Sequence, residues 1–121
     1  NIISIIDDDL SILEFMETVF SIESNFKINT YTNGQEFIDD IKKNTPDLIL
    51  LDLMMPVMDG FEVLSTMSLL NISVPVIIIT AVTKKESVIK ARKYGVKNYI
   101  TKPCKPDLIL KKAKEILEAS L

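Results

Sequence analysis

The stretch Pro46 to Gly60, PDLILLDLMMPVMDG, decides the fold. Within it, Leu48 to Leu51 is a continuous apolar run, which predicts a β-strand buried on both faces, as in a parallel sheet. The run ends on one carboxylate, Asp52, shortly before an Asp-Gly turn. Burying a charge at the end of such a strand costs free energy unless a partner compensates it. Asp52 is therefore the first candidate for a functional residue.

Four other segments predict strands. Three of them are apolar and rich in β-branched residues, like the central run. The fourth alternates between apolar and polar residues, which predicts an edge strand. The three apolar segments are Ile2 to Ile6, Val74 to Ile79 and Val96 to Thr101, and the alternating one is Phe26 to Tyr31.

Between the strands, apolar residues recur every three or four positions, which predicts amphipathic helices. Asp9 and Asp59 are good N-caps, and Gly95 suits a left-handed helix end. The apolar stripes are Leu10, Leu13, Val19 and Phe20; Phe37, Ile38 and Ile41; Phe61, Leu64 and Met67; Val88, Ala91 and Tyr94; and Leu108, Leu110, Ala113, Ile116 and Leu117.

Five strand-helix units in succession predict an α/β fold, a doubly wound (βα)5 sandwich with a parallel sheet and helices on both faces. With 121 residues, the chain 1–121 is expected to be one domain. Its first residue is Asn1 rather than methionine, which is compatible with a piece of a longer chain. No apolar run approaches the roughly 20 residues of a membrane span, so we expect a cytoplasmic location and no membrane partner.

The residue types limit the possible chemistry. A single cysteine, Cys104, permits no internal disulfide, and the chain contains no histidine. The usual zinc and Cys/His catalytic sites are therefore excluded, and a metal ion would have to bind oxygen.

Polar residues follow four of the predicted strands. Asp7 and Asp8 follow the first, Asp52 the third, Thr80 the fourth and Lys102 the fifth. In doubly wound sheets, ligands bind beyond the carboxyl ends of the strands. We therefore expect these five residues to form one site.

The charges of this site suggest its chemistry. Three carboxylates repel one another, and Lys102 supplies one positive charge. A Mg²⁺ ion, which prefers carboxylates, waters and phosphate oxygens, would balance the rest. Mg²⁺ with a lysine is typical of phosphoryl transfer, in which a carboxylate can act as the nucleophile. Asp52 is the predicted nucleophile because it stands alone after the central strand.

Four motifs in this order resemble the response regulator receiver domain, the CheY-like family of two-component signalling. They are IIDDD at 5–9, LLDLMMPVMDG at 50–60, IIITA at 77–81 and YITKP at 99–103. The resemblance covers the whole chain and implies strand order 2-1-3-4-5. It departs at Cys104, where the family usually has a bulky aromatic residue.

The resemblance also implies a role for each site residue. Asp52 would accept a phosphoryl group from the phosphohistidine of a sensor histidine kinase or a phosphotransfer protein, and Lys102 would bind a phosphoryl oxygen. Thr80 and Tyr99 would switch the face built by the fourth helix, fifth strand and fifth helix, where an output domain or partner protein binds. The bond between Lys102 and Pro103 would be cis. The Mg²⁺ ligands would be Asp7, Asp8, Asp52 and the backbone carbonyl of Met54.

Three alternatives compete with this interpretation. A phosphohydrolase would need a second acid two residues after the nucleophile, where this chain has Met54. In a flavodoxin-like cofactor site, the acids at 7–9 would repel the phosphate. The third alternative is a phosphorylation-independent interaction module, which would lack an acid, the nucleophile or the lysine.

Charge is distributed unevenly along the chain. Residues 1–83 carry 13 acidic residues against 3 lysines, whereas residues 84–121 carry 11 basic residues against 4 acidic ones. Solvated helix faces explain most of the basic excess. The functional hypothesis is an acidic protein partner on the fourth helix, fifth strand and fifth helix. A homodimer through this face stays open, and direct nucleic-acid binding is not expected, because no helix-turn-helix or arginine-rich arm is present.

Overall fold

The computed structural model describes residues 1–23 and 25–119, in which five strands alternate with five helices. None of these helices combines the length and apolar character needed to cross a membrane. The elements are β1 (Ile2–Ile6), α1 (Leu10–Ser21), β2 (Lys27–Tyr31), α2 (Gly34–Asp40), β3 (Leu48–Leu51), α3 (Gly60–Leu69), β4 (Val76–Thr80), α4 (Lys85–Lys93), β5 (Asn98–Thr101) and α5 (Pro106–Ala119).

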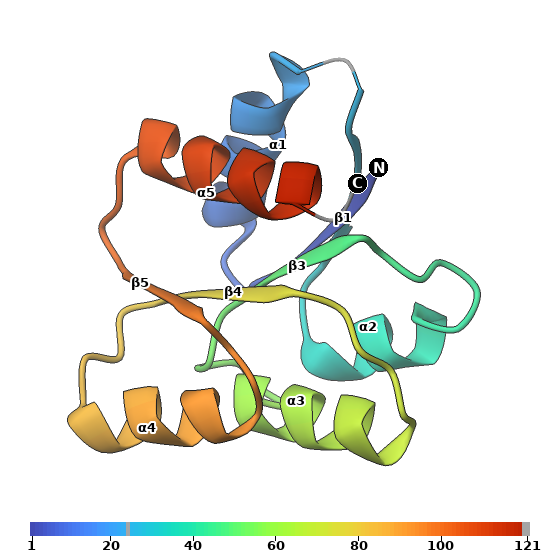
Figure 1. Cartoon of the computed structure of the whole chain (residues 1–121), viewed down its shortest axis with the longest axis vertical. Helices are drawn as coiled ribbons and strands as arrows, with labels where there is room; N and C mark the ends of the chain where they lie inside the picture. The colour runs from blue at the N-terminus through green and yellow to red at the C-terminus, as the bar shows by residue number, and fades with distance from the viewer. Residues whose placement is uncertain (24, 120–121) are drawn as a thin grey trace.

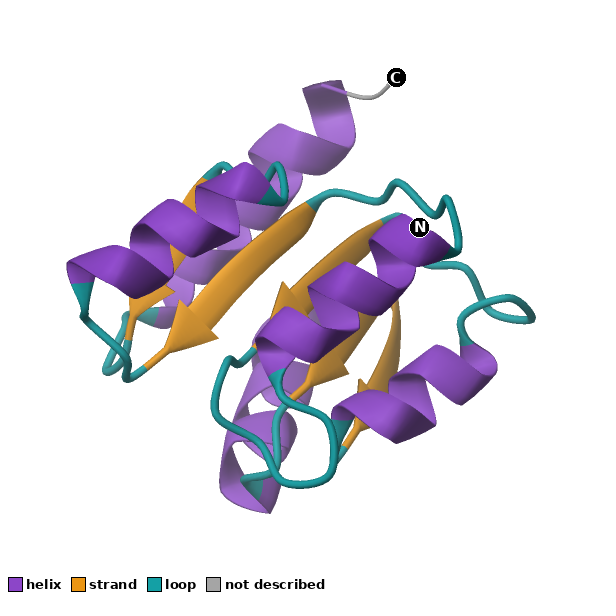
Figure 2. Cartoon of the chain, turned by 90° about the horizontal axis from the view of Figure 1, so that it is seen from below, coloured by secondary structure: helices purple, strands orange, loops and turns teal. Residues whose placement is uncertain are grey.

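The strands form one parallel sheet in the order β2-β1-β3-β4-β5, with all strands pointing the same way (Figure 2). This confirms the predicted order and the edge position of β2. The register aligns Ile6 with Leu51, and Thr80 with Thr101. The carboxyl ends of β1, β3, β4 and β5 therefore lie along one edge of the sheet.

Helices cover both faces of the sheet (Figure 1). Helices α1 and α5 pack on one face, with Phe20 and Ile109 fully buried, and α2, α3 and α4 pack on the other, with Phe37 fully buried. Neighbouring residues of one strand serve opposite cores, as Ile5 and Ile6 do. This alternation explains why the central strands are apolar at every position. Each fully buried aliphatic side chain contributes about 1.5–3 kcal/mol.

Three strands begin later than predicted, and β2 does so by one residue, at Lys27 rather than Phe26. β5 begins at Asn98 rather than Val96, because the Val96 N–H donates to the carbonyl of Ala91 at the end of α4. β4 begins at Val76 rather than Val74, after Pro75, which has no N–H to donate. Local helix capping and proline chemistry therefore override the apolar pattern at the amino ends of β5 and β4.

Three residues assigned to apolar helix stripes lie at the surface instead. Leu10, Tyr94 and Leu108 are exposed, Leu10 by 63%. Leu10 and Leu108 lie in the first turns of α1 and α5, and Tyr94 is the cap residue after α4. The buried apolar positions that the pattern missed are Met16 in α1, Val63 in α3 and Ile109 in α5.

The predicted helix ends are confirmed. The carboxylates of Asp9 and Asp59 accept hydrogen bonds from the backbone N–H groups of Ser11 and Glu62. Gly95 has a φ of 88°, as a left-handed helix end requires. These caps fix where α1 and α3 begin, and so fix the two loops that carry the acidic residues.

Candidate functional site

The predicted residues meet at the carboxyl edge of the sheet. Asp7 and Asp52 directly follow β1 and β3, and their backbone N–H groups extend the ladder by donating to Tyr31 and Ile6. Both acids are therefore held by the sheet itself. Their residues are only 4% and 7% exposed, whereas Asp8, which follows Asp7, is exposed.

Three carboxylates lie close enough to share one cation. Asp7, Asp8 and Asp52 each offer an oxygen, and these oxygens all lie within 4.8 Å of one another. Asp7 Oδ1 accepts the N–H of Asp9 at 3.0 Å, and Asp52 Oδ1 accepts that of Met54 at 3.2 Å. Among the described residues, the Asp8 carboxylate has no hydrogen-bond partner. An oxygen-only donor set with one uncommitted carboxylate fits Mg²⁺.

Lys102 joins the two buried acids. Its Nζ lies 2.6 Å from Asp7 Oδ2 and 2.8 Å from Asp52 Oδ2. The Lys102 N–H donates to the carbonyl of Thr80, and the Lys102–Pro103 peptide bond is cis, as predicted. The ammonium group thus takes one oxygen of each acid, while backbone N–H groups take the other.

The pKa values of Asp7 and Lys102 are both shifted by burial and by the contacts within the cluster. Burial raises the pKa of Asp7 above its usual 3.8, although hydrogen bonds from Lys102 and from the Asp9 N–H act in the opposite direction. Burial alone would lower the pKa of Lys102, but the hydrogen bonds to Asp52 and Asp7 outweigh it and raise the pKa above 10.5. The lysine is therefore charged throughout the physiological pH range.

Thr80 and Tyr99 meet at one backbone segment, that of Val82. Thr80 is fully buried at the end of β4, and its Oγ1 accepts the N–H of Val82 in a long contact of 3.4 Å. The Tyr99 hydroxyl donates to the Val82 carbonyl at 2.7 Å. Burial, and then the charge of Asp52, raise the pKa of Tyr99. The loop between β4 and α4 therefore connects the two residues.

The backbone behind Asp52 is closely packed at Gly60. A Cβ on Gly60 would lie 2.5 Å from the Asp52 carbonyl oxygen and 2.8 Å from Leu53 Cα. The Gly60 N–H donates to the Leu53 carbonyl at 3.1 Å. Only glycine lets α3 begin this close to the loop that holds Asp52.

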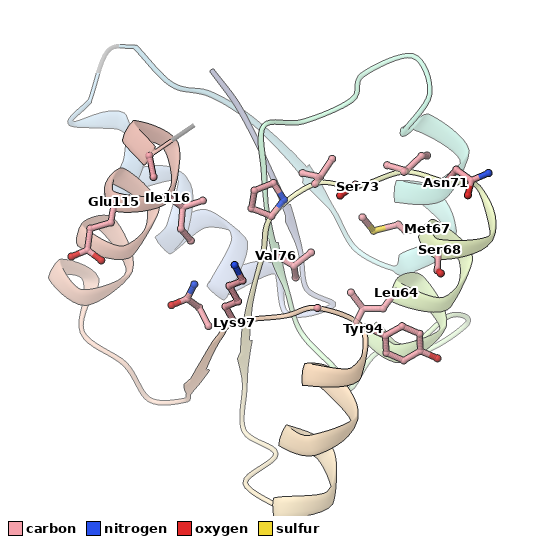
Figure 3. A pocket seen from close by; sticks show the side chains of 16 residues that line it. Leu64, Met67, Ser68, Asn71, Ser73, Val76, Tyr94, Lys97, Glu115 and Ile116 are labelled. Carbon is pink, nitrogen blue, oxygen red and sulfur yellow. The ribbon is translucent and has the colours of Figure 1, made fainter. Parts of the chain in front are cut away.

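The opposite edge of the sheet has a different character. A pocket of about 810 Å³ lies beside the amino ends of β4 and β5 (Figure 3). Its lining includes Leu64, Met67 and Ile116, with Lys97 and Glu115 as its charged residues. None of the predicted site residues lines it.

Comparison with known proteins decides the family. The model of the family described as "Response regulator receiver domain" matches residues 3–114. The chain belongs to the response regulator receiver family. Its members are phosphoacceptor switches rather than true enzymes.

Individual relatives agree with this assignment. The receiver domain is 33% identical over 108 residues to the response regulator SaeR of Staphylococcus aureus, covering 88% of this chain and 46% of SaeR. It therefore spans less than half of that relative. The CheY-like receiver domain protein of Methanospirillum hungatei is 28% identical, with a TM-score of 0.91 over 98% of this chain and 94% of the other. The BeF3-activated receiver domain of DrrB, from Thermotoga maritima, is 28% identical, with a TM-score of 0.86 over 97% of each chain.

Sequence reasoning found the acids and the lysine of this receiver domain but missed the part that Val82 plays. The side chain of Val82 is apolar and makes neither contact, whereas its backbone N–H and carbonyl bind Thr80 and Tyr99. No sequence pattern signals a backbone group as a partner. The available signal was its position, two residues after Thr80.

Proposed function

We propose that this receiver domain stores a signal as a phosphoryl group on Asp52, received from the phosphohistidine of a sensor histidine kinase or phosphotransfer protein. The observation that carries the proposal is the placement of Asp52. Its carboxylate is nearly buried, lies 2.8 Å from Lys102 and shares a cation-sized space with Asp7 and Asp8. A nucleophile, a fixed positive charge and oxygen ligands thus stand at one point.

We infer that Asp7, Asp8, Asp52 and the backbone carbonyl of Met54 hold Mg²⁺. When bound, the ion would supply positive charge that neutralises the negative charge of the acids and of the phosphoryl group. Asp8 is the exposed ligand and offers an uncommitted carboxylate, whereas Asp7 is held by the Asp9 N–H. Asp7 and Asp8 would therefore remain ligands of the ion while Asp52, the third acidic ligand, also serves as the nucleophile.

The transfer is a displacement at phosphorus. A carboxylate oxygen of Asp52 attacks, a P–O bond forms, and the P–N bond to the donor imidazole breaks, with its electron pair leaving on the imidazole nitrogen. Lys102 then exchanges its contact with Asp52 for one with a phosphoryl oxygen. Asp7 keeps the ammonium group in place during this exchange, since the two are 2.6 Å apart. Positioned charge of this kind accounts for most of such catalysis.

Phosphorylation replaces the Asp52 carboxylate with a group of charge about −2, which brings new acceptor oxygens near Thr80. We propose that the Thr80 hydroxyl turns to one of these oxygens and gives up its long contact with Val82. Tyr99 is tied to the same residue and so responds to this movement. The change reaches the α4-β5-α5 face, formed by Lys85–Lys93, Asn98–Thr101 and Pro106–Ala119, where an output domain or partner binds.

Intact mass tests the proposal. The protein is incubated with Mg²⁺ and acetyl phosphate, beside Asp52→Asn, Asp59→Asn and a chelator control. We expect one added phosphoryl group on the unchanged protein and on Asp59→Asn, because Asp59 only caps α3. We expect none on Asp52→Asn or with chelator. If acetyl phosphate and a panel of histidine kinases all leave the mass unchanged while Mg²⁺ binds, the domain is a phosphorylation-independent interaction module instead.

A further inference from the structure

Strand β5 is an edge strand, and no hydrogen-bond partner among the described residues is found for its outer backbone groups. It pairs only with β4 in the sheet of the described residues (Figure 1). The Lys102 N–H donates to the Thr80 carbonyl, so the backbone of residue 102 faces β4. Backbone direction alternates along a strand, and Ile100 therefore faces β4 as well. The N–H and C=O groups of Tyr99 and Thr101 point away from the sheet, where they can pair with another chain.

A groove runs beside this edge. It has a volume of about 760 Å³ and is lined by β5, the loop after it and α5. Cys104 and Leu108 give it an apolar floor next to the strand. A strand added to β5 would turn alternate side chains into this groove.

The groove is positively charged, which favours a negatively charged ligand. Lys97, Lys105 and Lys112 line it, and none of its described lining residues is acidic. Lys112 has the exposed Glu115 carboxylate at 3.7 Å, and no ion pair is found for the other two lysines among the described residues. Lysines on an edge strand can simply prevent aggregation. Lys105 and Lys112, however, lie off the strand, on the following loop and on α5, where they do not guard the edge.

We propose that the free edge of β5 binds an acidic protein segment in extended conformation, which adds to the sheet as a sixth strand with its carboxylates beside Lys97, Lys105 and Lys112. Main-chain hydrogen bonds to Tyr99 and Thr101 provide affinity, and alternate acidic side chains provide specificity. A second copy of this chain does not fit, because its own β5 edge carries the same lysines. Single-stranded nucleic acid fits less well, because the hydroxyl of Tyr99 is bound to Val82 and the groove contains no arginine.

This proposal does not rest on phosphotransfer, so its test uses the protein without phosphodonor. The probe is a fluorescent acetylated peptide of four Glu-Val repeats, compared with four Lys-Val repeats and with a thymidine oligonucleotide of eight residues. Binding is measured by fluorescence anisotropy and located by amide chemical shifts and hydrogen exchange. We expect the acidic peptide to bind at least tenfold more tightly than either comparison probe. We also expect the amide protons of Tyr99 and Thr101 to exchange more slowly in the complex.

Two variants separate the main-chain contact from the charge. Thr101→Pro removes an outward N–H and leaves the ladder to β4 intact, so binding should weaken roughly fivefold relative to Thr101→Val, which keeps the donor. Lys112→Glu should weaken binding roughly tenfold. Lys42→Glu, an equal change of charge on the far side of the sheet, should not. Thermal melting confirms that each variant is folded.

The outcomes are distinct. Equal binding of acidic and basic peptides, or chemical shifts that map away from β5, overturns the proposal. So does unchanged affinity in both Thr101→Pro and Lys112→Glu. Tighter binding of the oligonucleotide assigns the lysines to nucleic acid instead, and absence of acidic-peptide binding at millimolar concentration also overturns the proposal.

Discussion

The two edges of the sheet use acidic residues differently. At the amino edge, Asp47 accepts the N–H of Ile2 at 2.7 Å and so completes the first strand. At the carboxyl edge, Asp7 and Asp52 are buried next to a lysine and keep oxygens directed toward a common space. A carboxylate that caps the backbone is structural, whereas buried carboxylates that repel one another require a cation. Both edges are formed by the same strands. They differ in charge, because the buried carboxylates at the carboxyl edge exceed the one lysine beside them.

The largest effect is expected from Lys102→Met. Without the ammonium group, no fixed positive charge meets the phosphoryl oxygens, and phosphorylation by acetyl phosphate should slow by about 100-fold or more. The initial rate of mass increase measures it. Lys97→Met removes a lysine at the amino edge and should leave the rate unchanged. Equal rates in both variants would remove the distinction between the edges.

A second effect concerns the lifetime of the phosphoryl group. Met54 and Val82 lie two residues after Asp52 and Thr80, and their apolar side chains can neither orient a water nor accept a proton. Met54→Asn combined with Val82→Glu should speed dephosphorylation by up to about 100-fold. The rate is measured by the loss of the phosphoryl group from the protein, followed by intact mass, after the phosphodonor is removed.

The control for that pair is Leu69→Glu, an exposed apolar position at the end of α3 on the amino side. It should leave the lifetime unaltered. We infer that the apolar side chains of Met54 and Val82 prolong the lifetime of the phosphoryl group. A double variant that loses its phosphoryl group as slowly as the unchanged protein contradicts this hypothesis.

Alanine substitutions at Gly60 and Gly95 compare the carboxyl and amino edges of the sheet by their effect on the free energy of unfolding. Gly60→Ala places a methyl group against the backbone of Asp52 and Leu53 and should cost about 2–3 kcal/mol of unfolding free energy. A Cβ on Gly95 meets nothing within 4 Å, so its cost comes only from the left-handed φ and should be about 1 kcal/mol. Urea unfolding measures both. A larger loss at Gly95 would mean that packing behind Asp52 is not the tighter constraint.

The smallest effect is a pH dependence at the end of β2. The Tyr31 hydroxyl donates to Asp40 Oδ2 at 2.5 Å, and this bond, followed by one from Asn44, lowers the pKa of Asp40 below 3.8. The contribution to stability is present above pH 3.8 and is lost as the pH falls through the folded pKa. Tyr31→Phe should therefore make stability fall less steeply below pH 4.

Urea unfolding between pH 2.5 and 6 measures this slope, and Tyr94→Phe at the amino edge is the matched control. An identical slope in all three proteins would show that the bond to Asp40 has no effect on stability. A change in the phosphorylation rate of Tyr31→Phe would mean that the end of β2 belongs to the site after all.

Much of the fold could be read from the sequence, because a buried parallel strand must be apolar throughout. Leu48 to Leu51 and Ile2 to Ile6 are strands over the predicted residues. Errors arose where a local hydrogen bond competes with the apolar pattern, as at Val96, or where an apolar residue in the first turn of a helix is exposed, as at Leu10. Neither condition can be recognised from the spacing of apolar residues in the sequence.

The sequence by itself determined which residues follow the strands, since polar residues after apolar runs are visible in one dimension. Only the tertiary structure decided how they meet. Lys102 is 95 residues from Asp7, and the crossovers of a parallel sheet bring them to 2.6 Å. The link through the Val82 backbone and the free edge of β5 are likewise tertiary facts. Sequence patterns specify side chains, whereas the packing of strands and helices determines which backbone groups remain available for contacts.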